Sequence, residues 1–146
     1  GGAGLAVIEY MTSIYSNMSL SSVPVTAMDA PSVGRMVFLY RAETSTTLNT
    51  DIKAFMSRND GMNYTQVDLT DEGPYLGTHS GEPNLTSPTD DGTYRILVGT
   101  AVLSGQTLTY APTSVHHPSG APIMTWNIQT YNNKYQRIRA VSHMWY

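Results

Sequence analysis

The sequence predicts an all-β protein, an antiparallel β-sandwich of the jelly-roll-like kind. Three observations predict it: several short segments have strand patterns, Gly, Pro, Asn and Asp turn signals separate them, and no helical segments alternate with them. Charged residues make up only 13% of the chain, so its surface has to be polar but mostly uncharged. This composition is typical of rigid extracellular or particle-surface β proteins.

The length of 146 residues suits one domain with a substantial core. We expect a stalk or connector at residues 1–22, a Pro-containing linker at residues 23–34 and the β-sandwich domain at residues 35–146. The chain has no cysteine, which excludes disulfides and thiolate metal sites. No apolar run has the length of a bilayer span, so we expect no membrane insertion.

The N-terminal segment has a pattern of its own. Apolar or aromatic residues occur at alternating spacings of three and four, as in a helical seam: Ile8, Met11, Tyr15 and Met18. Two interpretations stay open. One is a short helix that forms an oligomer seam, and the other is an edge strand followed by a Ser-rich loop.

Strand patterns begin after the linker. Residues 35–41 form a nearly continuous apolar run, which suits a strand covered on both faces. Residues 50–58 and 63–69 alternate around Asp60-Gly61, a dipeptide that favours a tight turn. The alternation predicts these core residues: Ile52, Ala54, Met56, Val67 and Leu69. It places Lys53, Phe55 and Ser57 on the opposite face of the first strand, and Tyr64, Gln66 and Asp68 on the opposite face of the second.

The second half of the chain continues this pattern. Residues 70–92 predict a long loop, which is a favourable place for partner contact. Further strands are predicted at 93–99, 106–111, 122–131 and 135–146. The polar turn at 132–134 predicts a hairpin between the last two.

The charges are unevenly distributed. Residues 1–91 contain all eleven acids with four bases, a net charge of −7, and residues 92–146 contain four bases, a net charge of +4. Four bases are too few for a surface that follows phosphates, so we expect no nucleic-acid partner. The asymmetry predicts complementary packing between the halves, within a chain or between copies.

Residues with reactive side chains occur without a recognisable catalytic motif. Asp68, Asp71 and Glu72 are interpreted as solvated acids of turns, and His116-His117 as loop histidines with no third ligand nearby. No nucleophile elbow, phosphate loop or zinc helix is present. We therefore predict a protein that is not an enzyme and has no catalytic residues, metal or cofactor.

Aromatic residues are the remaining candidates for a site, because an aromatic ring can stack on the apolar face of a sugar. Ten Tyr and two Trp are present. The candidate contacts with a partner or glycan are Tyr75, His79, Tyr94, Trp126, Tyr131 and Trp145. Strand aromatics more often fill a core or a subunit interface, so both interpretations stay open.

The order of the segments resembles a known group of proteins. The stretches "TLNTDIKAFMSRNDGMNYTQVDLTDEG", "YRILVG", "IMTWNIQTYNN" and "RIRAVSHMWY" are similar to the C-terminal β-domain of structural proteins on tailed-phage particles. The resemblance covers about residues 29–146. The chain departs from the pattern by extra residues between Gly73 and Tyr94 and by Tyr146 after Trp145.

This resemblance implies a virion protein, a fibre or appendage β-domain that acts in assembly or host-surface attachment. The partners it implies are other copies, expected as a homotrimer, other capsid or tail proteins, and a host-surface glycan. In a trimer, the seam through Ile8, Met11, Tyr15 and Met18 would end a helical stalk. A capsid decoration (cement) protein and a free carbohydrate-binding module are the alternatives.

Overall fold

The computed structural model describes residues 5–9, 17–75, 94–115, 118 and 120–146, with the backbone alone for 5–9. These residues form nine strands and no α-helix, and among them no candidate membrane-spanning helix occurs. The strands are β1 (Leu5–Glu9), β2 (Ser19–Ser21), β3 (Val25–Thr26), β4 (Val33–Ala42), β5 (Ile52–Ser57), β6 (Thr65–Pro74), β7 (Arg95–Val102), β8 (Ile123–Thr130) and β9 (Gln136–Trp145). Every pairing between these strands is antiparallel, which confirms the predicted all-β antiparallel class.

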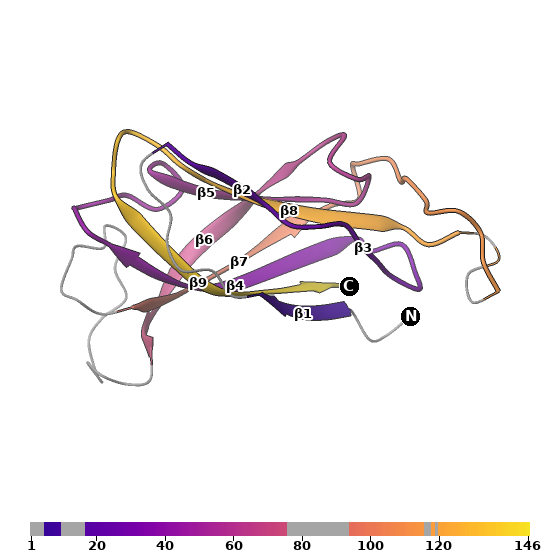
Figure 1. Ribbon diagram of the computed structural model, residues 1–146, viewed down its shortest axis with the longest axis horizontal. Coiled ribbons are helices and arrows are strands. Elements are labelled where there is room, and N and C mark those ends of the chain that lie inside the picture. The colour runs from indigo at the N-terminus through magenta and orange to yellow at the C-terminus, as the bar shows by residue number, and fades with distance from the viewer. Residues whose placement is uncertain (1–4, 10–16, 76–93, 116–117, 119) are drawn as a thin grey trace.

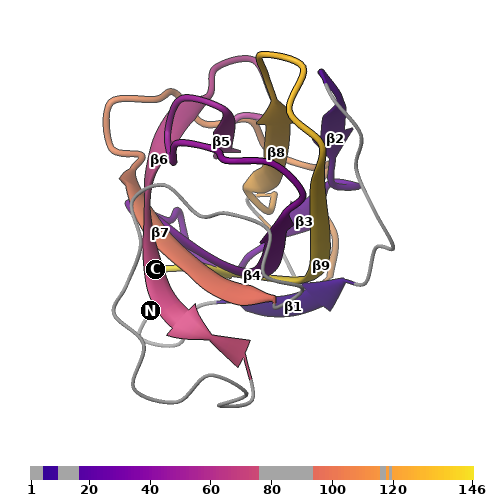
Figure 2. The ribbon, with the colours of Figure 1, turned by 90° about the vertical axis from the view of Figure 1, so that its left-hand side faces the viewer.

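The strands form one curled sheet in the order β1-β9-β4-β7-β6-β5-β8-β2, and β3 pairs with β8 (Figures 1 and 2). In the end-on view of Figure 2, β4 and β7 lie on one side and β5 and β8 on the other. Strand β6 belongs to both sides, because it pairs with β7 through residues 68–74 and with β5 through residues 65–67. The sheet therefore encloses its own core as a half-barrel.

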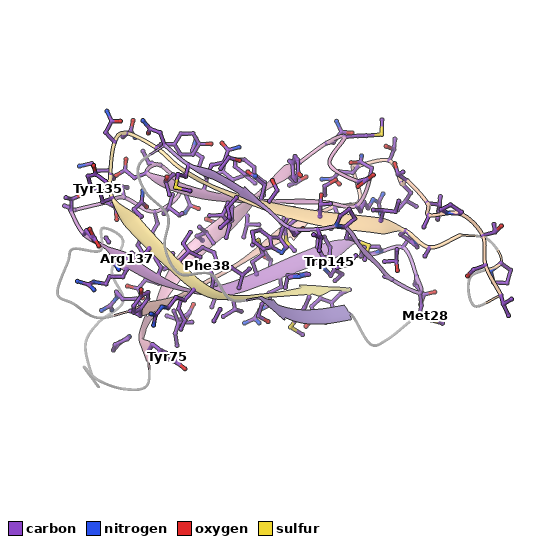
Figure 3. All side chains as sticks on the ribbon, in the orientation of Figure 1. Met28, Phe38, Tyr75, Tyr135, Arg137 and Trp145 are labelled. Atoms are coloured by element: carbon purple, nitrogen blue, oxygen red, sulfur yellow. The ribbon has the colours of Figure 1, made fainter. Side chains whose placement is uncertain are left out.

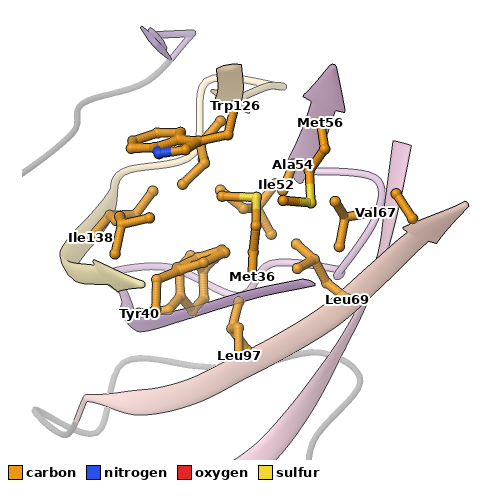
Figure 4. Close-up of a cluster of buried hydrophobic side chains, with 14 of the residues drawn as sticks. Met36, Tyr40, Ile52, Ala54, Met56, Val67, Leu69, Leu97, Trp126 and Ile138 are labelled. Atoms are coloured by element: carbon orange, nitrogen blue, oxygen red, sulfur yellow. The ribbon is translucent and has the colours of Figure 1, made fainter. Parts of the chain in front are cut away.

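The core is built from the inward-facing residues of both sides, shown in Figure 4. All five core residues predicted from the alternation are at most 2% exposed. They pack with Met36, Phe38 and Tyr40 of β4 and with Trp126 of β8. Burial raises the pKa of the Tyr40 hydroxyl, which stays protonated and donates to Gln136 Oε1 at 2.6 Å.

In strand β9 the alternation of inward and outward side chains shifts by one residue. Its pairing with β4 shifts register between Val37 and Leu39, opposite Ala140, which has a positive φ of 50°. This is a β-bulge, and it allows Ile138 and Val141 to be fully buried although they are three positions apart in the strand. Regular alternation would have exposed one of the two.

The N-terminal segment contributes strands to the sheet. Residues 5–9 form β1, in which Ile8 pairs with Ser142 of β9, and Met18 precedes β2. Of the two interpretations left open, the edge strand therefore holds at residues 5–9 and the helix is wrong there, because the segment gains backbone hydrogen bonds with β9. Met11 and Tyr15 lie outside the described residues. The expected linker, residues 23–34, contains β3 and the start of β4.

Three other local predictions are wrong. Strand β6 continues to Pro74, into the predicted loop, because residues 70–74 pair with β7. Residues 106–111 form no named strand; Tyr110 makes an isolated bridge to Pro122. The turn at 132–134 does not close a hairpin: β8 pairs with β5, and β9 crosses to the opposite side and pairs with β4. Asn132 and Asn133 both have positive φ, which reverses the chain without pairing the strands it joins.

Two ion pairs connect the acidic and basic halves of the sequence. Arg95 Nε lies 2.5 Å from Asp71 Oδ2, with both side chains at most 2% exposed, and Arg137 pairs with Glu43 at the surface. The predicted complementary packing between the halves is confirmed within the chain. Asp71 is not a solvated turn acid, as we had predicted. It lies inside the sheet between β6 and β7, where Gly73 N also donates to it at 2.7 Å.

Candidate ligand-binding face

Strands β2, β8, β5 and β6 present a polar outer surface. The register places Ser21, Asn127, Phe55 and Gln66 in one row across these strands, and Ser19, Gln129 and Lys53 in the next. Side chains of one row point to the same side of a sheet, and the alternate residues of each strand face the core. We call this surface the polar face, and it consists of Ser19, Ser21, Lys53, Phe55, Gln66, Asn127 and Gln129.

Aromatic rings border the polar face at two places. Phe55 and Tyr64 meet edge to face, with ring centroids 6.4 Å apart, and Tyr64 Oη lies 3.3 Å from Thr125 Oγ1. Lys53 Nζ lies 5.0 Å from the centre of the Tyr131 ring, and the Tyr131 hydroxyl donates to Gln129 Oε1. These contacts hold the rings in fixed orientations beside amide and hydroxyl groups.

Asn127 fixes the middle of the polar face. Its Nδ2 donates to Ser21 Oγ at 2.8 Å, to Ser19 Oγ at 2.9 Å and to the Leu20 carbonyl at 3.2 Å. The side chain is 6% exposed, and its Oδ1 is buried without a hydrogen-bond partner among the described residues. The short strand β2 is thus attached to β8 through a side chain as well as through its backbone.

A hollow of about 170 Å³ lies next to the polar face, lined by Asn49, Gln66, Val67 and Asp68. It lies where β5 and β6 stop pairing, and the Asn49 side chain bridges this gap. Asn49 Oδ1 accepts from Leu69 N and its Nδ2 donates to Leu69 O, both at 2.9 Å. Gln66 and Asp68 are exposed at the rim, so the hollow offers amide and carboxylate groups to a ligand.

A buried histidine connects the two sides of the sheet beneath the polar face. His143 of β9 is fully buried, and its ring centroid lies 6.2 Å from that of Trp126 and 5.9 Å from that of Trp145. Trp145 Nε1 donates to His143 Nδ1 at 2.9 Å, so the neutral ring carries its proton on Nε2. Burial lowers the pKa of His143 to about 4.

The structure separates the six candidate contact residues. Trp126 and Trp145 belong to the core, with exposures of 0% and 2%, so their rings are not available to a glycan. Tyr75 and Tyr94 lie together, Tyr75 N donating to Tyr94 O at 2.9 Å, and Arg139 lies over the Tyr94 ring. Tyr131 alone of the described five borders the polar face. His79 lies outside the described residues, as do His116 and His117.

The sequence contained a signal for the polar face that the search for aromatic contacts missed. The alternation already grouped Lys53 with Phe55 and Gln66 with Tyr64, opposite the core residues of their strands. Applied to residues 123–130, the same rule places Met124, Trp126 and Ile128 on the core side of the strand and Thr125, Asn127 and Gln129 on the outer side. The sequence could not show that β5, β6 and β8 are neighbours in the sheet. The polar face exists because these strands lie side by side.

The polar face offers amides, hydroxyls and oriented rings with one positive charge, from Lys53. Such groups suit an uncharged polyhydroxylated ligand, which needs several hydrogen bonds and an apolar surface for stacking. Comparison with known proteins finds no matching family model and no significantly similar curated protein.

Proposed function

We propose that this protein is a structural β-domain on the surface of a bacteriophage particle, a fibre or appendage domain that attaches the particle to a host-surface glycan. The observation that carries this proposal is the polar face: amides, hydroxyls and oriented rings are held rigidly next to a hollow rimmed by Gln66 and Asp68. The resemblance of residues 29–146 to phage structural domains supports the location. Weak single contacts would add up by avidity, because a particle presents many copies.

The location is tested by cryo-EM of the particle that carries this chain. Density for the half-barrel on the tail or projecting from a vertex supports a fibre or appendage. Copies distributed over the capsid lattice support the second candidate, a decoration protein. The observation that favours the second candidate is the row of half-buried apolar side chains outside β4 and β7, which would suit packing on a shell protein.

The attachment role is tested by titrating the purified chain against a panel of immobilised neutral polysaccharides. Tyr64→Ser and Gln66→Ala are expected to weaken binding about tenfold each, because each removes a stacking surface or a hydrogen bond. Tyr135→Ser is the matched control, since Tyr135 is 50% exposed and Tyr64 is 42% exposed. Figure 3 places Tyr135 at the end of the molecule next to Arg137. Equal losses in Tyr64→Ser and Tyr135→Ser, or no binding to any polysaccharide, would remove the attachment role.

A further inference from the structure

The outer surface of β9, β4 and β7 differs from the polar face in chemistry. The register places Val37 opposite Val98, Leu39 opposite Ile96 and Val33 opposite Val102. Met144 of β9 extends this surface beside β4. We call it the aliphatic face, and it consists of Val33, Val37, Leu39, Ile96, Val98, Val102 and Met144.

These side chains point away from the core. Their strand neighbours, such as Met36, Phe38 and Leu97, are fully buried, whereas the residues of the aliphatic face are partly exposed and Val102 is 66% exposed. An antiparallel sheet that packs on a core with one face normally presents polar side chains on the other. Val37, Leu39, Ile96 and Val98 are contiguous on this surface. A contiguous apolar patch outside a sheet marks an interaction site.

Charged residues border the aliphatic face on its two sides, with opposite signs. Arg139 on β9 lies on one side, and Asp68 and Glu72 on β6 lie on the other. Arg35 lies inside the face, on β4 between Val33 and Val37. One row of the register contains both signs: Met144, Arg35, Thr100 and Asp68. The surface is thus a mainly aliphatic face, interrupted by Arg35 and Thr100, between a basic border on β9 and an acidic border on β6.

We propose that the aliphatic face binds a second copy of this chain. A two-fold axis parallel to the strands would place the basic border of one copy against the acidic border of the other and the aliphatic centres against each other. The four strands β9, β4, β7 and β6, about 4.8 Å apart, cover on the order of 600 Å². Standard interfaces bury roughly 800 Å² per partner, so this area is at the low end of specific interfaces and suits a weak association.

The aliphatic face and the polar face share no residue; Asp68 alone belongs to both surroundings, at the rim of the hollow and on the acidic border. The aliphatic face replaces the helical seam, since Ile8 lies in a strand that pairs with β9. The sequence predicted that both faces of the strand at residues 35–41 are covered, and the proposed interface accounts for this. The core covers one face, and the partner copy covers the other.

Sedimentation of the full chain at micromolar concentration tests the proposal. The unaltered chain is expected to exceed the monomer mass of 16.0 kDa. Val98→Lys is expected to weaken association at least about tenfold, because an ammonium group would be buried without a partner. Val115→Lys, the same substitution at a residue that is 92% exposed and belongs to neither face, is the control and should leave the mass unchanged. A monomeric parent chain, or a Val98→Lys oligomer as stable as the parent, would overturn the proposal.

A second pair of variants avoids any loss of folding. The chain has no cysteine, so a single introduced thiol can be followed with a bulky maleimide. Val98 and Gln129 are both partly exposed. The thiol of Val98→Cys should react more slowly as the protein concentration rises, whereas the thiol of Gln129→Cys should react at a constant rate. A Val98→Cys thiol whose reaction rate is independent of concentration contradicts a shared interface. Val98→Lys should leave glycan binding by a single copy unchanged. Self-association and glycan attachment can therefore fail separately.

Discussion

The two outer faces of the half-barrel follow the same alternation and cover the same core, yet they carry opposite chemistry. The polar face, on β2, β8, β5 and β6, presents amides and hydroxyls; the aliphatic face, on β9, β4 and β7, presents Val, Leu, Ile and Met. On both sides of the sheet the inward residues build the core. The outward residues can therefore contact a ligand or another protein. The difference indicates that the polar face contacts water and polar ligands, whereas the aliphatic face is suited to contact with another protein surface.

The largest expected effect concerns the half of the sheet with the aliphatic face. Arg95→Leu removes the partner of Asp71 and leaves a carboxylate buried between β6 and β7. We expect a loss of about 3–5 kcal/mol in the free energy of unfolding, measured by urea denaturation. Arg137→Leu breaks the partly exposed pair with Glu43 and should cost less than about 1 kcal/mol. Equal losses would mean that the Asp71 site admits water.

The next largest effect is on the pH dependence of stability. It concerns the contact between the two sides of the sheet, where His143 of β9 packs between Trp126 of β8 and Trp145. Its folded-state pKa of about 4 is below the ordinary value of 6.5, so only the unfolded chain binds a proton between these pH values. Stability from this group is complete above pH 6.5 and falls as the pH drops toward 4, by at most about 3 kcal/mol.

His143→Asn tests that pH dependence, because its Oδ1 can still accept from Trp145 Nε1 while the side chain does not titrate. The free energy of unfolding, measured in urea at pH 7 and at pH 4.5, should change less in this variant than in the parent chain. The same change in both proteins would assign the acid sensitivity to other groups.

A smaller effect is expected where β6 and β7 approach closely. A Cβ on Gly99 would lie 2.4 Å from Asp68 O and 2.5 Å from Val67 Cγ1. Gly99→Ala should therefore shift the pairing of β6 with β7 and cost about 1–3 kcal/mol in thermal or urea unfolding. Gly105→Ala is the control, because no atom lies within 4 Å of the added methyl group. A neutral Gly99→Ala would show that β6 and β7 can separate freely.

The smallest expected effect concerns the junction of the two halves at Asn49. This residue has a φ of 63° and joins its side chain to both backbone groups of Leu69. Asn49→Gly keeps the favourable φ but loses these bonds, and should cost about 1 kcal/mol in the free energy of unfolding. Asn49→Ala should cost more, since alanine disfavours this φ. Identical free energies of unfolding for Asn49→Gly and Asn49→Ala would show that the positive φ at residue 49 does not affect stability.

Much of the fold was predictable because it depends on local patterns. The alternation in residues 50–58 and 63–69 identified all five predicted core residues, and Asp60-Gly61 forms a turn with positive φ at both residues. At the N-terminus the sequence left a helix and an edge strand open, because spacings of three and four over so few residues suit both; the structure shows a strand at residues 5–9. Of the candidate contact residues, Tyr131 borders the polar face, whereas Trp126 and Trp145 are core residues.

The sequence by itself determined the all-β class, the inward residues of β5 and β6 and a cysteine-free core. The tertiary structure decided that β9 crosses to pair with β4, that Ala140 forms a bulge, and that Asp71 meets Arg95 inside the sheet. The physical reason is that side-chain alternation is a property of each strand, whereas backbone hydrogen bonds between strands are nearly independent of sequence. Neighbouring strands, and with them both outer faces, are therefore selected by the packing of the whole core.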